Sequence, residues 1–287
     1  MKRRLPLMTP KFWTKLPRAS FFPALGKLQG DLMGSVVITG ASSGFGRAAA
    51  KCFSEAGFDL VLVARRADRL AEVKAALSSK VDVLTIALDV RDKDDVLASL
   101  TALPDQMAEV SVLINSAGLA LGLGGANDAD LDDWDAMVDT NIKGLMYCTR
   151  AILPGMVTRG AGQIINLGSV AGSWPYPGGN VYGGTKAFVQ QFSRNLRADL
   201  LGKGIRVTNI EPGMCETEFS KVRFGGDEVQ AAAVYQGMQP LSAEDVAEVI
   251  LWVAMRPPHV NVNQLELMPV SQAWSGFSVH REDGAGG

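Results

Sequence analysis

The sequence predicts an α/β protein built on a single doubly wound parallel sheet with helices on both faces. Three observations favour this fold class: short β-branched runs alternate with longer helical stretches, the runs are almost continuously apolar, and a glycine-rich loop follows the first of them. No linker or change in composition interrupts the pattern between residues 34 and 270. We therefore expect one domain over 34–270, an N-terminal extension of residues 1–33 and a C-terminal tail of residues 271–287.

The expected elements alternate along the chain. In the first half, strand 36–39 precedes helix 47–56, strand 60–64 precedes helix 69–77, and strand 83–88 precedes helix 94–103. In the second half, strand 112–115 precedes the long helix 133–151, strand 163–167 precedes the long helix 182–201, and strand 205–210 and a weaker strand near 264–268 complete the sheet. Strands followed by helices in this way are typical of parallel sheets covered on both faces.

The loop after the first strand predicts a dinucleotide site of the Rossmann type. Gly40, Gly44 and Gly46 allow a tight turn, a close backbone approach to phosphate, and close packing of the helix on the strand. The helix N-terminus then faces a pyrophosphate. The intervening loop residues expected to contact the cofactor are Ser42, Ser43 and Phe45.

The same loop also matches the nucleophile elbow of a hydrolase, with Ser42 as the nucleophile. That mechanism needs a histidine later in the chain, and only His259 and His280 exist. The elbow would also fall on the first strand of the core, so we favour the dinucleotide site.

The end of the second expected strand indicates which dinucleotide binds. Arg65 and Arg66 stand about where an acidic residue would hydrogen-bond the ribose of NAD, and arginine instead accommodates a 2′-phosphate. The nearest acid, Asp68, comes later and is expected to cap a helix that begins at Arg69. The sequence therefore predicts NADP as the cofactor.

Two further strand ends should meet the cofactor, because ligands bind at the carboxyl edge of such sheets. Asp89 and Val90 end the third strand and are placed to meet the adenine. The segment 115–118 ends the fourth strand, and its Asn115, Ala117 and Gly118 are the residues expected at the cofactor. Any one of these residues could be an ordinary turn residue, so they count only together.

Tyr182 and Lys186 are the strongest candidates for catalysis. They stand four residues apart in an expected helix and so lie on one face, one turn apart. A free phenol has a pKa of about 10 and is a poor base at neutral pH, but an adjacent ammonium group favours the phenolate. We expect Lys186 to lower the pKa of Tyr182 so that the pair transfers a proton; the alternative is an ordinary solvated helix surface.

Composition excludes several classes of function. The formal net charge of −2 does not favour a nucleic-acid partner. Three cysteines without a CxxC spacing and two histidines near the C-terminus do not favour a disulfide framework or a metal site. No apolar run reaches the about 18 residues that a membrane-spanning helix needs, so no integral membrane contact is expected.

The extension of residues 1–33 is basic and contains no continuous apolar segment, so a secretory signal fits poorly. We expect either a disordered tail or an upstream start codon, and we favour the second because Met33 directly precedes a strand. A peripheral membrane contact is the alternative, through the aromatic residues Phe12, Trp13, Phe21 and Phe22.

The chain resembles the short-chain dehydrogenase/reductase family over about residues 34–270. Seven separated elements occur in the family's order and approximate spacing: the loop 39–46, the segment 115–118, Asn141, Ser169, Tyr182, Lys186 and the pair Pro212-Gly213. Ser116 stands where the family usually has asparagine. Within the family, the stretches 118–122, 171–176, 179–182, 217–220, 222–224, 261–263 and 268–270 are similar to NADP-dependent 3-hydroxy acid dehydrogenases acting on serine, allo-threonine and 3-hydroxypropionate or malonic semialdehyde.

The resemblance implies a role for each catalytic residue. Tyr182 exchanges the proton of the substrate alcohol, and Lys186 assists it and binds the nicotinamide ribose. Ser169 orients the substrate oxygen, and Asn141 holds a water that connects Lys186 to solvent. Pro212, Gly213 and Thr217 are expected beside the nicotinamide.

For the substrate, we expect Arg223 to bind the carboxylate of a small hydroxy acid, because a guanidinium group pairs with a carboxylate in bidentate fashion. Trp174, Tyr176 and Phe219 should wall the pocket. The resemblance also implies a homotetramer, and the three cysteines without a disulfide or zinc spacing favour a cytoplasmic location. Two alternatives stay open: a general NADPH carbonyl reductase with no carboxylate requirement, and a non-catalytic NADP sensor.

Overall fold

The computed structural model describes residues 34–274. The predictions for the extension of residues 1–33, and for the tail beyond residue 274 with His280, lie outside the described residues. No helix between residues 34 and 274 is long and apolar enough to cross a membrane.

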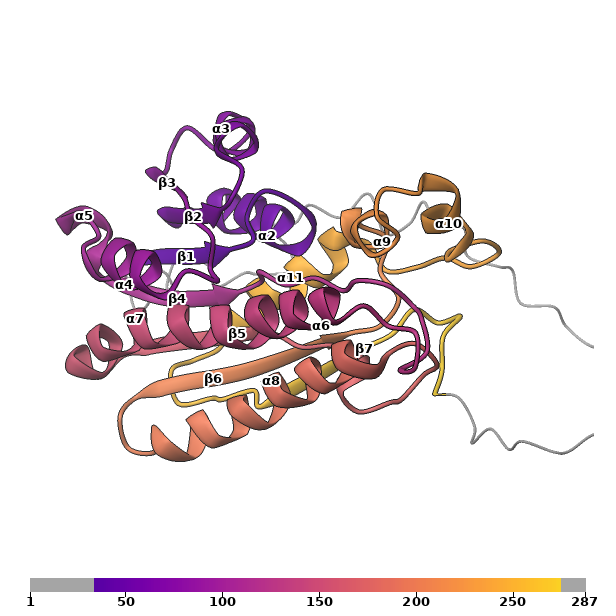
Figure 1. The fold of residues 1–287 in the computed structure, drawn as a ribbon. Helices are drawn as coiled ribbons and strands as arrows, with labels where there is room; N and C mark the ends of the chain where they lie inside the picture. The colour runs from indigo at the N-terminus through magenta and orange to yellow at the C-terminus, as the bar shows by residue number, and fades with distance from the viewer. Residues whose placement is uncertain (1–33, 275–287) are drawn as a thin grey trace, which may run out of the picture. The chain divides into compact units, whose positions relative to one another are not determined.

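A seven-stranded sheet organises the described chain, with the strand order β3-β2-β1-β4-β5-β6-β7 (Figure 1). Every neighbouring pair is parallel, and the order reverses direction between β1 and β4. The predicted fold class is therefore confirmed. The strands are β1 (Ser35–Thr39), β2 (Leu60–Ala64), β3 (Val83–Ala87), β4 (Val110–Asn115), β5 (Gly162–Leu167), β6 (Ile205–Pro212) and β7 (Gln264–Leu267).

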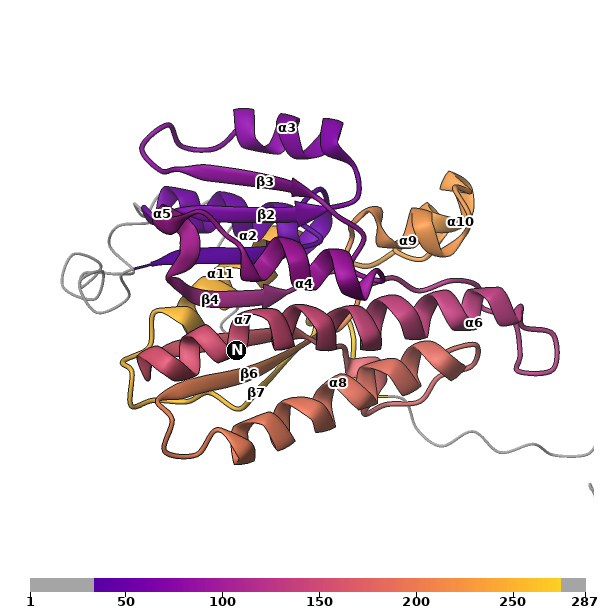
Figure 2. The same ribbon diagram turned by 60° about the vertical axis from the view of Figure 1, so that its left-hand side comes forward.

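Helices cover both faces of the sheet. Figure 2 shows α2 and α11 on one face and α4, α7 and α8 on the other. The helices between β1 and β5 are α2 (Gly44–Glu55), α3 (Ala67–Ala75), α4 (Lys93–Thr101), α5 (Asp105–Ala108), α6 (Leu131–Val138), the π-helix η3 (Asp139–Gly144) and α7 (Leu145–Arg159). Those after β5 are the 3₁₀ turn η4 (Val170–Gly172), α8 (Asn180–Asp199), α9 (Glu218–Arg223), α10 (Glu228–Ala233) and α11 (Ala243–Ala254).

The central strands explain why their sequences are continuously apolar rather than alternating. Every residue of β1, β2 and β4 is buried, because helices lie against both faces of the sheet at these strands. One core cluster joins Val37, Val61 and Leu113 of the strands to Ile152 and Met156 of α7. This core holds the carboxyl ends of the strands in fixed register, and those ends carry the candidate site.

Several predicted helix bounds differ from those observed. The second helix begins at Ala67 and not at Arg69, so Arg66 is the N-cap residue and Asp68 lies in the first turn. Asp68 therefore does not cap the helix, although an acidic side chain in the first turn still suits the helix dipole. The helix expected over 133–151 is α6 and α7 joined by the π-helix η3.

The helix α11 lies outside every range predicted as helical. Ser242 starts it with a capping box, in which its side chain accepts from the backbone of Asp245 and the Asp245 carboxylate accepts from the backbone of Ser242. The buried residues Val246, Ile250 and Val253 form the face that packs on the sheet and α2. The Ser-x-x-Asp spacing before an apolar run is a sequence signal for this helix.

Candidate active site

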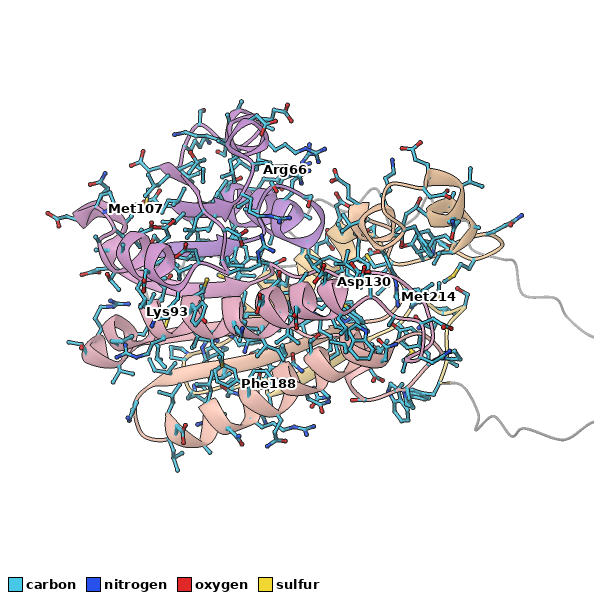
Figure 3. The ribbon with its side chains drawn as sticks, viewed as in Figure 1. Arg66, Lys93, Met107, Asp130, Phe188 and Met214 are labelled. Carbon is cyan, nitrogen blue, oxygen red and sulfur yellow. The ribbon has the colours of Figure 1, made fainter. Side chains whose placement is uncertain are left out.

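Two adjoining cavities lie at the carboxyl edge of the sheet and share Phe45, Thr217 and Phe219 in their linings. The first is a cleft of about 190 Å³ over the glycine loop. The second is a cavity of about 610 Å³ beside β5 and β6. In Figure 3, Arg66 and Met214 are labelled, and they line the first and the second cavity, respectively.

The glycine loop forms the floor of the cleft as predicted. Gly40 has a φ of +68°, and a Cβ on it would come within 2.9 Å of the backbone of Ala117 on the neighbouring loop. A Cβ on Gly46 would collide with the carbonyl oxygen of Gly40. Gly40 therefore brings the two loops together, and Gly46 lets α2 pack directly on its own loop.

Most of the predicted cofactor residues line this cleft. They are Gly40, Ser42, Ser43, Gly44, Phe45, Arg65, Arg66, Asp89, Val90, Ala117, Gly118 and Thr217. Pro212, Gly213 and Tyr182 line the neighbouring cavity instead. Gly46 lies beneath the loop, and Lys186 is buried behind both linings.

Asn115 is one predicted cofactor residue that the structure places away from the cleft lining. It is 3% exposed, and its amide group donates hydrogen bonds to Thr149 at 3.0 Å and to Asn166 at 2.9 Å. It therefore ties the end of β4 to α7 and β5. This polar network positions the loop that follows it.

The far end of the cleft carries positive charge. Arg66 donates a hydrogen bond to the hydroxyl group of Ser42 at 3.4 Å and lies 3.8 Å from the carboxylate of Glu218. Arg69 donates to both oxygens of Glu218, at 2.8 and 2.7 Å. Ser42 thus faces an arginine rather than a histidine, which is not the arrangement that a hydrolase triad requires.

Asp89 lines the cleft at the end of β3 and forms an ion pair with Arg91 at 2.7 Å. Burial raises the pKa of its carboxyl group, but hydrogen bonds from Arg91 outweigh that effect, so the net pKa is lowered. A carboxylate is thus kept beside the position predicted for the adenine.

Tyr182 and Ser169 come together on the wall of the larger cavity. Tyr182 is 8% exposed and Ser169 is 9% exposed, and both line the cavity. Burial raises the pKa of Tyr182 to about 12, against an opposing hydrogen bond with Ser169 and the nearby charge of Arg223. The Ser169 hydroxyl group also accepts from the backbone of Ala171, so it caps η4.

Lys186 lies one helical turn below Tyr182, with its Nζ 5.8 Å from the centre of the tyrosine ring. The Nζ donates to the carbonyl oxygen of Leu167 at 2.8 Å, and a Cβ on Gly118 would lie 3.5 Å from it. Burial lowers the pKa of Lys186 to about 8. The predicted lowering of the Tyr182 pKa is therefore wrong for the site as observed, because removal of the phenol from water is the largest effect on its pKa.

Asn141 lies in the π-helix and is 2% exposed. Its Oδ1 accepts from the backbone N–H of Leu119, and its Nδ2 donates to the Leu119 carbonyl group and to Thr185 of α8, each at 2.8–3.0 Å. Both Nδ2 hydrogens are therefore used within the protein. The predicted water would have to bind through Oδ1 or the backbone carbonyl group.

Arg223 is anchored over the larger cavity by residues distant in sequence. Its Nη2 donates to the Tyr176 hydroxyl group at 2.9 Å, and its Nε donates to the carbonyl oxygen of Gly122 at 3.2 Å. The guanidinium carbon lies 5.7 Å from the centre of the Tyr182 ring. The structure thus brings the predicted anion-binding residue beside the predicted proton-transfer residue.

The other predicted wall residues also line this cavity. Phe219 places its ring 5.6 Å from that of Tyr182. Trp174 donates to Glu266 at 2.7 Å and packs 5.5 Å from Trp274. Tyr176 is held by Arg223, as described above.

Several lining residues were not among the predicted site residues. Leu119, Thr140, Glu218 and Val222 line the cleft, and Met214, Ser220, Tyr235, Gln272 and Trp274 line the larger cavity. Gln272 accepts from the backbone of Met214 at 2.7 Å. Residues 272 and 274 thus belong to the site, although the domain was expected to end at residue 270.

A parallel doubly wound sheet, a glycine loop at its switch point and a buried Tyr–Lys–Ser group together define a dinucleotide-dependent oxidoreductase site. The family model described as "short chain dehydrogenase" matches residues 35–226. The chain belongs to the short-chain dehydrogenase family, and it is an oxidoreductase. The resemblance inferred from the separated motifs is confirmed.

Relatives and a solved structure match most of the chain. Sulfoacetaldehyde reductase 2 of Chromohalobacter salexigens is 56% identical over 248 residues, which span 86% of this chain and 98% of the relative. The NADP-dependent 3-hydroxy acid dehydrogenase YdfG of Escherichia coli is 52% identical over 249 residues, which span 86% and 99%. The closed form of a serine dehydrogenase complexed with NADP+ superposes with a TM-score of 0.83 at 50% identity, covering 86% of this chain and 99% of that one.

Proposed function

We propose that the protein transfers a hydride between NADP(H) and the C3 hydroxyl or carbonyl group of small 3-hydroxy acids, such as serine, allo-threonine and 3-hydroxypropionate or malonic semialdehyde. One observation carries the proposal: the Arg223 guanidinium group lies 5.7 Å from the Tyr182 ring, over the same cavity. A relative that is 52% identical is named as an NADP-dependent 3-hydroxy acid dehydrogenase. A substrate anion at Arg223 would place its reacting carbon near Tyr182.

The cofactor is NADP, and the residues of the cleft fit it. The close approach of Gly40 to the backbone of Ala117 leaves a side-chain-free floor where a pyrophosphate can lie against backbone N–H groups. Arg65 and Arg66 would hold the 2′-phosphate at the far end. When bound, NADP supplies the hydride donor in reduction and the hydride acceptor in oxidation.

Tyr182 would move the proton at its Oη. Burial keeps this group a neutral phenol at neutral pH, with a pKa raised to about 12, and a phenol can donate its proton to the oxygen of a substrate carbonyl group. Ser169 would hold that oxygen by a hydrogen bond from its hydroxyl group. The ammonium group of Lys186, 5.8 Å from the ring centre, would stabilise the phenolate that remains.

Arg223 would select an anionic substrate. Its bonds to Tyr176 and to the Gly122 carbonyl group use two of its five N–H donors, and the others can meet a carboxylate in bidentate fashion. Because the guanidinium group is anchored, little side-chain entropy is lost when the anion binds. The proposal therefore requires a substrate with an acidic group a few atoms from the reacting carbon.

A second candidate substrate is a short sulfonated aldehyde. Two relatives, 56% and 54% identical, are named sulfoacetaldehyde reductases. A sulfonate offers the same charge and several acceptor oxygens to Arg223, so the pocket chemistry suits both anions. Only the relative kcat/KM values for the two anions distinguish these candidates.

The experiment is a panel that follows NADPH by absorbance during reduction of malonic semialdehyde, sulfoacetaldehyde and a neutral aldehyde of equal length. The wild type should prefer the anionic substrates. Arg223→Ala should raise KM for the anionic substrates about 10- to 100-fold, which is the range expected for loss of a pair of charge-assisted hydrogen bonds. The KM for the neutral aldehyde should stay unchanged. Lys221→Ala is the matched control, since Lys221 lies exposed on the same helix and pairs with Glu228.

The panel also separates the alternatives. Equal kcat/KM for acids and neutral aldehydes in the wild type would identify a general carbonyl reductase. A sensor would bind NADPH but catalyse neither reaction. It would not transfer a hydride from NADPH to any carbonyl compound, and it would not transfer one from serine or allo-threonine to NADP+. The proposed homotetramer is measured by light scattering during size-exclusion chromatography, and the cytoplasmic location by fractionation of cells that produce the full chain.

A further inference from the structure

We propose that Glu218 and Arg69 set the strength of 2′-phosphate binding at Arg66: Glu218 opposes the phosphate, and Arg69 neutralises Glu218. This inference rests on the proposed NADP site and assigns a specificity-determining role to two residues that were not among the predicted site residues. Glu218 is the first residue of α9, and Arg69 lies on α3, 149 residues earlier in the chain.

The geometry places a carboxylate directly at the cationic end of the cleft. Oε2 of Glu218 lies 3.8 Å from Nη2 of Arg66, and the same Nη2 donates to Ser42 at 3.4 Å. Glu218, Arg66 and Ser42 all line the cleft. A phosphate bound by Arg66 would therefore lie close to a second anion.

Arg69 approaches this carboxylate from outside the cleft lining. Its Nη1 donates to both oxygens of Glu218, at 2.8 and 2.7 Å. The pair is the shortest ion pair that Glu218 forms in the part of the chain that the structure describes. Glu218 thus pairs more closely with Arg69 than with Arg66, so Arg66 can direct its remaining N–H donors to the phosphate.

The negative charge of Glu218 affects the binding of NADP and of NAD unequally. NADP carries a 2′-phosphate with a charge of about −2 and NAD carries a hydroxyl group there, so an unneutralised Glu218 repels NADP far more than NAD. A ribose hydroxyl group can even donate a hydrogen bond to a carboxylate. The ratio of the two dissociation constants therefore reports the charge state of this cluster.

The test measures dissociation constants for NADP+ and NAD+ by calorimetry without substrate, so the readout does not depend on turnover. Arg69→Ala should weaken NADP+ relative to NAD+ by about fivefold, the size of one partly exposed charge interaction. Glu218→Gln should shift the ratio the other way. The double variant should recover at least the wild-type ratio, because the charge that Arg69 neutralises is then absent.

Two further variants are controls, one for the charge of Arg69 and one for the loss of an ion pair outside the cleft. Arg69→Lys keeps the positive charge and should keep the wild-type ratio. Glu228→Gln removes a carboxylate paired at 2.6 Å with Lys221, exposed and away from the cleft lining, and should leave the ratio unchanged. Side chains of Arg69 and Glu218 are 38% and 43% exposed, so their replacement leaves the core intact.

The outcomes decide between distinct explanations. If the double variant is as weak for NADP+ as Arg69→Ala alone, Arg69 binds the phosphate directly and the inference is overturned. If Arg69→Ala weakens the affinities for NADP+ and NAD+ equally, the inference is also overturned, because an equal loss indicates only a structural link between α3 and α9. A wild type without NADP+ preference would overturn the proposed cofactor site itself, together with this inference.

Discussion

The buried ammonium group of Lys186 should make the stability of the cofactor-free protein depend on pH in a specific direction. Lys186 is 7% exposed, and burial lowers its pKa from 10.5 to about 8. At about 1.4 kcal/mol per pKa unit, this shift costs the folded state about 3 kcal/mol whenever the lysine is charged in both states. Replacing it with methionine, which has a similar length and no charge, removes that cost.

The sign follows from the two pKa values. Below about pH 8 the lysine is protonated in the folded and the unfolded chain, and the full cost is present. Between pH 8 and 10.5 the unfolded chain binds more protons than the folded one, so the wild type gains stability as pH rises. Lys186→Met lacks this gain. The difference in unfolding free energy between the two should therefore change by about 2 kcal/mol between pH 7.5 and 9.5.

The assay is urea unfolding at a series of pH values up to 9.5, at one fixed protein concentration because an oligomer would make stability concentration-dependent. The variant also loses the hydrogen bond from Lys186 to the Leu167 carbonyl oxygen. The contribution of that bond cancels when the difference in unfolding free energy between wild type and variant at one pH is compared with the difference at another pH. Lys203→Met, at an exposed lysine in the turn after α8, is the control for replacing a lysine with methionine at a site that is not buried. A pH-independent difference for Lys186→Met would refute the assignment of the shift to burial.

Three further predictions follow from single contacts in the site. Tyr182→Phe should lower kcat by about 10²- to 10⁴-fold, as expected for loss of a general acid–base, with NADPH affinity measured by fluorescence unchanged. Asn141→Ala breaks three hydrogen bonds to Leu119 and Thr185 and leaves buried groups unpaired, so it should reduce the urea-unfolding free energy by about 2–4 kcal/mol. Gly46→Ala should weaken NADPH binding because its Cβ would collide with the Gly40 carbonyl group, and calorimetry measures this.

Each of these has a contrary outcome. Turnover near the wild-type rate in Tyr182→Phe would remove this phenol as the proton donor. An unfolding free energy within about 0.5 kcal/mol of wild type would show that Asn141 is not a structural clamp. Wild-type affinity in Gly46→Ala would mean that the loop can move away from α2 at no cost.

The local patterns were sufficient for the sheet, the glycine loop and the Tyr–Lys pair. The reason is that period and composition encode these features locally: a strand buried on both faces must be apolar throughout, and a turn with positive φ at Gly40 favours glycine. Arg65 and Arg66, which follow β2, line the cleft, so the position predicted from the sequence lies at the cleft in the structure.

The pKa values could not be predicted in the same way. Spacing places Lys186 beside Tyr182, but it does not report how much water reaches either group. Burial raises the pKa of Tyr182 and lowers the pKa of Lys186, and it is the largest cause of both shifts. Burial depends on the packing of β5, β6 and the segment around α9, which no window of the sequence around residue 182 contains.

The residues that line the two cavities fall into two groups, those that local sequence predicts and those that depend on tertiary packing. Residues whose role comes from their own backbone conformation or helical spacing, such as Gly40 and Tyr182, were recognised in the chain itself. Residues whose role comes from a partner far along the chain were not: Glu218 meets Arg69 across 149 residues, and Gln272 meets Met214 across 58. The amino-acid sequence alone was therefore enough to predict the fold class and the family correctly, and to place Tyr182 and Lys186 beside each other. Only the folded chain decided their ionisation and the partners that surround them, because both depend on which surfaces pack together and exclude water.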